Sequence, residues 1–125
     1  MSDPDDRKYT PAHQWVMPDQ SGDLLIGITD FAQNQLGDIL FVQLPRVGQV
    51  LGDQESCAVV ESVKSASDIP APLAGVVLAL NSALSDSPEV LNTRPYDNWL
   101  FKMRPAHPQD VARLLNVEQY RPLTS

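Results

Sequence analysis

The stretch from Val59 to Asp68 constrains the fold most, because it predicts a hairpin. An apolar run, Cys57 to Val60, leads into small polar residues, and a second extended segment begins at Ile69. Two strands joined by a short polar break form a β-hairpin. Pro70 and Pro72 stiffen the returning arm, because each proline fixes its own φ and biases the preceding residue toward extended geometry. We therefore expect the protein to be organised around this antiparallel pair.

Further short segments with alternating or continuous apolar residues predict additional strands. They are 14–16, 24–28, 39–44, 49–51, 75–80 and 99–104, and the first arm of the hairpin extends over 55–62. The segment Ile39–Leu44 is apolar on both sides, which predicts a strand covered on both faces. Trp99, Phe101 and Met103 alternate with Leu100, Lys102 and Arg104, which predicts a half-buried strand. Gly48–Leu51 and Gly75–Leu78 share three of four residues, one before the hairpin and one after it.

Helices are expected only at the edges of these strands. They are a helix through Leu36 capped by Thr29 or Asp30 and ended by Gly37, a single turn near 82–84 within the loop 81–98, and a helical tail from Pro108 to Leu115 followed by a last turn from Asn116 to Tyr120. Many short strands with peripheral helices indicate a mostly β architecture.

Length and charge narrow the class of protein. A chain of 125 residues fits one domain, from residue 8 to 125, behind a flexible N-terminus at residues 1–7. The net charge of −7 disfavours nucleic acid and anionic membrane as partners. No apolar run approaches the roughly 20 residues of a membrane helix, and the start of the chain lacks the apolar core of a signal peptide.

The sequence lacks the residue patterns of a metal centre or a catalytic site. No Cys/His spacing suggests a metal, and no Ser/His/Asp order or phosphate-binding glycine loop is present. The single cysteine, Cys57, excludes an internal disulfide, and its apolar neighbours predict a buried, inert thiol. We therefore expect a protein that is not an enzyme, with no catalytic and no metal-binding residues.

Lys64 is the residue that stands out in the hairpin. It is the only lysine between Lys8 and Lys102, and its neighbours are too small to shield it. A lysine side chain carries a reactive nitrogen on a flexible four-carbon stem, which suits covalent modification. The alternative is a solubilising charge at a turn, which is the usual role of a surface lysine.

The sequence around Lys64 resembles the lipoyl-attachment signature of the glycine cleavage system H-protein family, in the form Glu61-Ser62-Val63-Lys64-Ser65-Ala66-Ser67-Asp68. The resemblance extends in the family's order from Lys8 to about Tyr120. It includes Lys8-Tyr9-Thr10, His13-Gln14-Trp15, Gly27-Ile28-Thr29-Asp30, Leu36-Gly37-Asp38, Phe41-Val42-Gln43-Leu44-Pro45, Gly75-Val76-Val77, Asn92, Pro95-Tyr96 and Trp99-Leu100-Phe101-Lys102. A match that runs along most of the chain is more specific than one loop.

The resemblance implies the fold, the cofactor and the partners. The fold would be a barrel-sandwich hybrid of lipoyl/biotinyl-domain type with short peripheral helices. Lipoate would be attached covalently to Lys64, where its strained disulfide takes the aminomethyl group left after glycine decarboxylation. The partners would be glycine decarboxylase, aminomethyltransferase, dihydrolipoamide dehydrogenase and a lipoylating enzyme. We expect a monomer in a bacterial cytoplasm; a mitochondrial form that had lost its presequence would look the same.

The residues beside Lys64 are further site candidates by the same resemblance: Glu61, Ser62, Val63, Ser67 and Asp68. The two acids would be recognised by the lipoylating enzyme or would line the resting place of the loaded arm. The alternatives are a turn-forming role for Asp68 and a solvated edge charge for Glu61.

Two departures from the family pattern open an alternative function. The family's usual His-Glu-Trp, which contacts the loaded arm, is here His13-Gln14-Trp15, and Gln14 offers no negative charge to an amine. Trp15 would then pack in the interior and His13 would be a surface or hydrogen-bonded residue. The loop from Tyr96 to Trp99 is shortened and lacks the usual glycine, so we expect Asp97 or Asn98 to make the bend in left-handed geometry.

These departures favour a second candidate, an H-like carrier that relays lipoate to other proteins or serves a different pathway. A third is a structural or regulatory β-domain with Lys64 unmodified.

Overall fold

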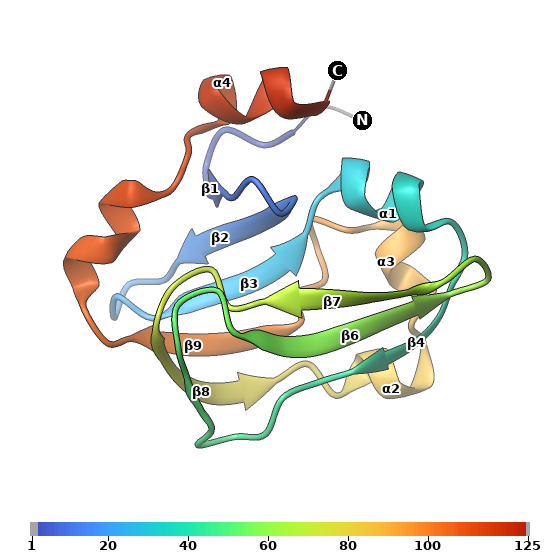
Figure 1. The fold of residues 1–125 in the computed structure, drawn as a ribbon, viewed down its shortest axis with the longest axis horizontal. Helices are drawn as coiled ribbons and strands as arrows, with labels where there is room; N and C mark the ends of the chain where they lie inside the picture. The colour runs from blue at the N-terminus through green and yellow to red at the C-terminus, as the bar shows by residue number, and fades with distance from the viewer. Residues whose placement is uncertain (1–2, 125) are drawn as a thin grey trace.

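Two antiparallel sheets face each other across an apolar core, and short helices flank their edges (Figure 1). The computed structural model describes residues 3–124. The strands are β1 (Lys8–Tyr9), β2 (Gln14–Pro18), β3 (Leu24–Ile28), β4 (Ile39–Gln43), β5 (Val50–Leu51), β6 (Ser56–Ser62), β7 (Ala66–Pro70), β8 (Gly75–Leu80) and β9 (Phe101–Pro105). The helices are α1 (Asp30–Leu36), α2 (Ala83–Asp86), α3 (Val90–Thr93), α4 (Val117–Tyr120) and the 3₁₀ helices η1 (Pro108–Arg113) and η2 (Arg121–Thr124). The predicted mostly β fold with peripheral helices is confirmed.

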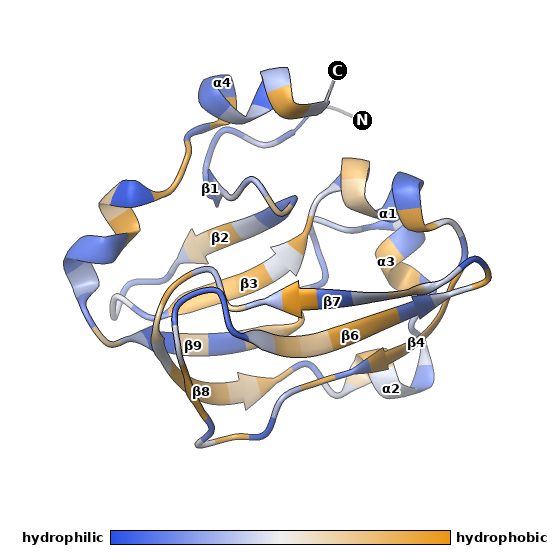
Figure 2. Ribbon diagram, in the orientation of Figure 1, coloured by the Kyte–Doolittle hydropathy of each residue, from blue (hydrophilic) through white to orange (hydrophobic). Residues whose placement is uncertain are grey.

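The core lies between a six-stranded sheet, in the order β1-β2-β3-β9-β8-β5, and a three-stranded sheet, in the order β4-β6-β7. Val16 and Ile26 of the larger sheet and Val42, Val60 and Ile69 of the smaller one are buried together. Figure 2 shows hydrophobic residues along the facing strands and both hydrophilic and hydrophobic residues at the tip of the β6–β7 hairpin. The hydrophobic burial therefore fixes the sheets and leaves the hairpin tip in solvent.

The predicted hairpin is present, but its second strand begins earlier than expected. Strand β7 starts at Ala66, not at Ile69, because Ala66, Ser67 and Asp68 pair with Glu61, Val60 and Val59 of β6. The polar break shrinks to residues 63–65. Lys64 therefore lies in a turn of three residues between two paired strands.

The prediction that the strand in Ile39–Leu44 is covered on both faces is wrong for β4. Ile39 and Val42 are buried, whereas Leu40 and Phe41 are exposed. The cause is a bulge: Ile39 lies opposite Ser62 and Phe41 opposite Glu61, so Leu40 is an extra residue in the ladder. A bulge shifts the alternation of side chains, and here it turns two consecutive large apolar residues outward.

The long loop after β8 contains two helices, α2 close to the predicted turn and α3, which was not predicted. The expected left-handed bend at Asp97 or Asn98 is wrong, because neither has a positive φ. The Asn98 side chain instead donates to the carbonyl of Arg94 at 2.9 Å, and the backbone N–H of Asp97 donates to the same carbonyl at 3.2 Å. Side-chain hydrogen bonding thus takes the place of a glycine.

Strand β9 begins at Phe101, later than the predicted Trp99. Phe101 and Met103 are buried as the alternation predicts. Leu100, which the alternation placed on the outer side, is also buried in the core. It precedes the strand, and its N–H donates to the carbonyl of Ile26 at 2.7 Å. The similar segments 48–51 and 75–78 pair with each other, Val50 opposite Val76.

The two ends of the chain meet at β1. The tail forms η1 and α4, and Asn116 caps α4 as predicted. The flexible N-terminus at residues 1–7 stays a prediction, and its residues 1 and 2 lie outside the described part. In the described part of this segment, the Arg7 guanidinium lies 4.7 Å from the Trp15 ring centre and donates to the carbonyl of Tyr96 at 2.9 Å. Between residues 3 and 124, no helix is both long enough and apolar enough to cross a membrane.

Candidate functional site

Lys64 lies at the exposed tip of the β6–β7 hairpin, and its amine is in no ion pair with another described residue. Ser62 builds the turn beneath it. The Ser62 N–H donates to the carbonyl of Ser65 at 2.8 Å, and the Ser62 hydroxyl accepts from the N–H groups of Lys64 at 3.2 Å and Ser65 at 3.3 Å. Such serine turns need no glycine. The predicted site residue Ser62 therefore orders the turn that presents the lysine.

The loop after α1 supports the turn from the side. The N–H of Val63 donates to the carbonyl of Asp38 at 3.0 Å. Gly37 has a φ of +78°, and a Cβ built on it would lie 3.2 Å from Cε of Lys64. A residue with a side chain would be strained at this φ and would press on the lysine stem. Gly37 thus ends the helix and leaves room for Lys64.

Asn92 of α3 holds this loop in place, a role that the sequence did not reveal. Its side-chain oxygen accepts from the N–H of Ile39 at 2.9 Å, and its nitrogen donates to the Gln33 side chain at 3.0 Å and to the carbonyl of Gly37 at 2.9 Å. One amide therefore ties the end of α1 to the start of β4. Asn92 matched the family pattern, but only the fold shows its partners.

The two acids near Lys64 lie on the outer face of the three-stranded sheet. Glu61 is exposed on the middle strand β6, so it is not an edge charge. Asp68 is exposed within β7, opposite Val59, so the alternative of a turn-forming residue is wrong. Ser67 lies opposite the buried Val60, and alternation along the strand places it on the other face from Asp68. Glu61 and Asp68 therefore share one surface of the sheet, which excludes Ser67.

Gln14 is fully buried at the base of the returning arm. Its side-chain nitrogen donates to the carbonyl of Pro70, and its oxygen accepts from the Thr10 hydroxyl at 3.0 Å. Both ends of the amide are engaged, so Gln14 joins β2 to the end of β7. A glutamate here would place an acceptor against the Pro70 carbonyl, which explains why an amide suits this position.

His13 is hydrogen-bonded, as one of its two interpretations predicted. Its Nδ1 lies 2.7 Å from the Tyr120 hydroxyl, which lies 2.8 Å from the Thr29 hydroxyl. The ring also packs on Phe31, with ring centres 4.4 Å apart. His13 has a φ of +63°. Its role is to link β2, α1 and α4, and burial lowers the pKa of its imidazole.

Stability is expected to fall when His13 is protonated. Its pKa in the folded state lies below the ordinary 6.5, so the unfolded chain binds the proton more strongly. The contribution of neutral His13 is complete above pH 6.5 and is lost as the pH falls through the lowered pKa. Urea unfolding at a series of pH values from about 7 to 5 measures the loss.

The matched variant is His13→Asn, because asparagine tolerates positive φ and does not titrate in this range. We expect its unfolding free energy to vary less between these pH values than that of the wild type. His107 is present in both proteins and cancels in the comparison. Equal pH dependence in the two proteins would contradict the prediction.

The burial of Cys57 differs in part from the prediction of a buried, inert thiol. The thiol is half-buried, not fully buried, and donates to the carbonyl of Ile69 at 3.3 Å. Burial, with a smaller effect of the Glu55 charge, raises the pKa of the thiol to about 12. A thiol with such a pKa is almost entirely protonated near neutral pH and a poor nucleophile.

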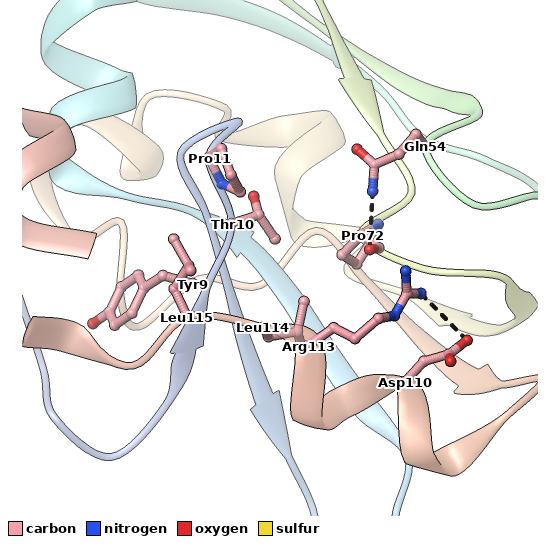
Figure 3. Close-up of a pocket in the computed structure, with 9 residues that line it drawn as sticks. All are labelled: Tyr9, Thr10, Pro11, Gln54, Pro72, Asp110, Arg113, Leu114 and Leu115. Atoms are coloured by element: carbon pink, nitrogen blue, oxygen red, sulfur yellow. Dashed lines mark hydrogen bonds and ion pairs between the residues drawn. The ribbon is translucent and has the colours of Figure 1, made fainter. Parts of the chain in front are cut away.

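A cavity of about 160 Å³ lies beside β1 and η1, among residues of other elements than the Lys64 turn (Figure 3). Its charged groups are paired within the protein. Arg113 reaches Asp110 at 3.4 Å and Asp53 at 3.4 Å, and the Gln54 side chain donates to the carbonyl of Pro72 at 3.1 Å. Of these contacts, the Arg113–Asp53 pair joins the tail to the turn between β5 and β6. Lys64 remains the centre of the candidate site.

Two facing sheets that present an exposed lysine at the tip of a hairpin, without an ion pair among the described residues, suit the carrier class of domain, in which the fold positions an attachment point. Comparison with known proteins gives the family. The Glycine cleavage H-protein family model matches residues 7–125. The chain therefore belongs to the glycine cleavage H-protein family.

Similar proteins of known name support this family assignment. The chain is similar to the glycine cleavage system H protein of Nitrosomonas eutropha, 48% identical over 98% of this chain and 95% of that protein. It is 52% identical to that of Ralstonia nicotianae, over 94% of this chain and 93% of that protein. A crystal structure of a glycine cleavage system H protein from Mycobacterium marinum superposes with a TM-score of 0.86 at 39% identity, covering 96% of this chain and 97% of that one.

Proposed function

We propose that this protein is a carrier of the glycine cleavage system, with a lipoyl group in amide linkage on Nζ of Lys64. The observation that supports the proposal most is the position of Lys64, exposed and without an ionic partner among residues 3–124. When attached, the lipoyl group supplies a disulfide sulfur that accepts the aminomethyl group from glycine. The protein supplies a fixed attachment point and takes no catalytic part.

The residues around Lys64 fit such an attachment. Neutral Nζ attacks the carbonyl carbon of an activated lipoyl donor, the bond to the leaving group breaks, and the amine proton passes to solvent. The attack requires an accessible nitrogen, which the exposed turn provides. Gly37 leaves the lysine stem unobstructed, and Ser62 keeps the turn ordered. The group fits because nothing bulky has to move.

The proposed partners are glycine decarboxylase, aminomethyltransferase, dihydrolipoamide dehydrogenase and a lipoylating enzyme. A carrier that visits several enzymes is best served as a monomer. The named relatives are bacterial, and a bacterial cytoplasm is the proposed compartment.

The burial of Gln14 favours a second candidate, a lipoyl carrier that serves other proteins or another pathway. Its amide is engaged by Pro70 and Thr10 and presents no charge to an amine on the arm. The first candidate predicts that the lipoylated protein supports exchange of bicarbonate into glycine with the other purified components, at a rate that rises with its concentration. Confirmed lipoylation without exchange would support the second candidate.

The Gln14→Glu variant tests the missing charge in the same assay. If the carrier works without a carboxylate here, the variant gains no exchange activity. It loses stability, because its carboxylate faces the Pro70 carbonyl in a buried place. A severalfold gain in exchange by the variant would show that the natural glutamine limits glycine cleavage.

A further inference from the structure

Three large apolar side chains are exposed around the Lys64 turn, and we call them the hairpin patch. Leu40, Phe41 and Val63 retain 60%, 48% and 61% exposure. They lie at adjoining positions, because Phe41 pairs with Glu61 and the N–H of Val63 donates to the carbonyl of Asp38. Single exposed apolar residues are ordinary, but a group of large ones indicates a contact surface.

The bulge in β4 creates most of this patch. Regular alternation would bury one of two consecutive residues, and here both Leu40 and Phe41 face outward between the buried Ile39 and Val42. Strand β4 is also an edge strand of its sheet. An exposed apolar edge promotes aggregation unless something covers it, and bulges commonly re-aim side chains at functional places. The fold therefore directs two apolar residues toward solvent at the edge of the sheet.

The charge around the patch indicates what kind of partner fits. Asp38, Glu61 and Asp68 are exposed around it, and none of them is in an ion pair with another residue between 3 and 124. The amine of Lys64 is the positive charge of the turn, and acylation would remove it. An apolar centre with an acidic rim is complementary to an apolar socket rimmed by lysine and arginine.

We propose that the hairpin patch is the docking surface for the enzyme that attaches lipoate to Lys64. This proposal rests on the proposed function, since it takes Lys64 as the modified residue. An enzyme that acts through the long lipoyl arm can meet the arm's end at a distance from the protein. The attaching enzyme must reach Nζ itself, on its short stem, and so must cover the residues around the turn. The patch and its acidic rim are these residues.

Removing the patch should weaken docking without changing the chemistry. With a purified ATP-dependent lipoate–protein ligase, lipoate and ATP, the double variant Leu40→Thr/Phe41→Thr should show a KM for the carrier at least about tenfold higher and a nearly unchanged kcat. Threonine keeps the strand preference of these positions. Raising the salt concentration should increase the KM of the wild type, because the rim acts through charge.

The matched control is Val47→Thr/Val50→Thr. Val47 and Val50 are 63% and 77% exposed, but Val50 belongs to the six-stranded sheet, away from the Lys64 turn. This variant should keep the wild-type KM. Thermal unfolding checks that both double variants remain folded. A Lys64→Arg protein that retains the patch should compete with the wild type for the ligase, and adding the two threonine substitutions to it should abolish the competition.

The outcomes separate the two proposals. A wild type that gains no lipoyl group overturns both the proposed function and the docking surface. A wild type that is modified, together with a Leu40→Thr/Phe41→Thr variant whose KM stays within about twofold of it, overturns the docking surface alone. Equal loss in the Val47→Thr/Val50→Thr control would also overturn it, since the effect would then not belong to this surface.

Discussion

Replacing Lys64 by arginine should abolish lipoylation completely. Arginine keeps the positive charge and the length of the side chain, but its guanidinium does not lose its proton near neutral pH and offers no nucleophilic nitrogen. Lys64 is exposed and makes no ion pair with a described residue, so the substitution should leave the fold and its stability unchanged. Intact mass after expression with lipoate should show the gain of one lipoyl group in the wild type and none in Lys64→Arg.

The control for this prediction is Lys102→Arg. Lys102 lies on β9 and pairs with Asp19 at 3.0 Å, so its amine is already engaged. The Lys102→Arg protein should be modified like the wild type, and fragmentation of the modified protein should place the group on the peptide that contains Lys64. Residual modification of the Lys64→Arg protein, located on Lys8 or Lys102, would contradict the assignment of the attachment site.

Local sequence signals predicted those features whose causes are themselves local. Thr29 accepts from the N–H of Ala32, and Gly37 ends α1, as the capping residues indicated. The Asn116 cap and the exposed Lys64 turn follow from residues a few positions apart. In such cases the interacting groups are neighbours in the chain, so composition and spacing contain the necessary information.

Apart from the bend at Asp97 and Asn98, which local hydrogen bonds to Arg94 decide, the main errors concern features that depend on a distant partner. Leu40 and Phe41 are exposed because the pairing of β4 with β6 contains a bulge, and no residue in Ile39–Leu44 marks its place. Asp68 resembles a turn residue but is held in β7 by Val59. Asn92 acts on Ile39 and Gly37, which are far away in the sequence. Register and long-range hydrogen bonds decide these positions, and the docking surface proposed above arises from the bulge.

Replacing Gly27 by alanine should cause the largest loss of stability among these predictions. Gly27 lies on β3 directly opposite Trp15 of β2, and the indole covers it. A Cβ at Gly27 would lie 2.2 Å from a carbon of the Trp15 ring. The ring cannot easily move away, because it is 2% exposed, its N–H donates to the carbonyl of Pro95 at 3.0 Å, and Arg7 stacks on its face.

The expected cost is about 3 kcal/mol or more, since either the sheet must open or the indole must leave its place in the core. For a domain of this size we expect the thermal midpoint to fall by roughly 10 °C. Calorimetry beside Gly52→Ala gives the control, because a Cβ at Gly52 meets only the Glu55 side chain, at 3.3 Å. If the cause is the indole, Trp15→Val should make the second change, Gly27→Ala, nearly harmless. Equal midpoints for Gly27→Ala and Gly52→Ala would mean that the strands accommodate a methyl group beneath the ring.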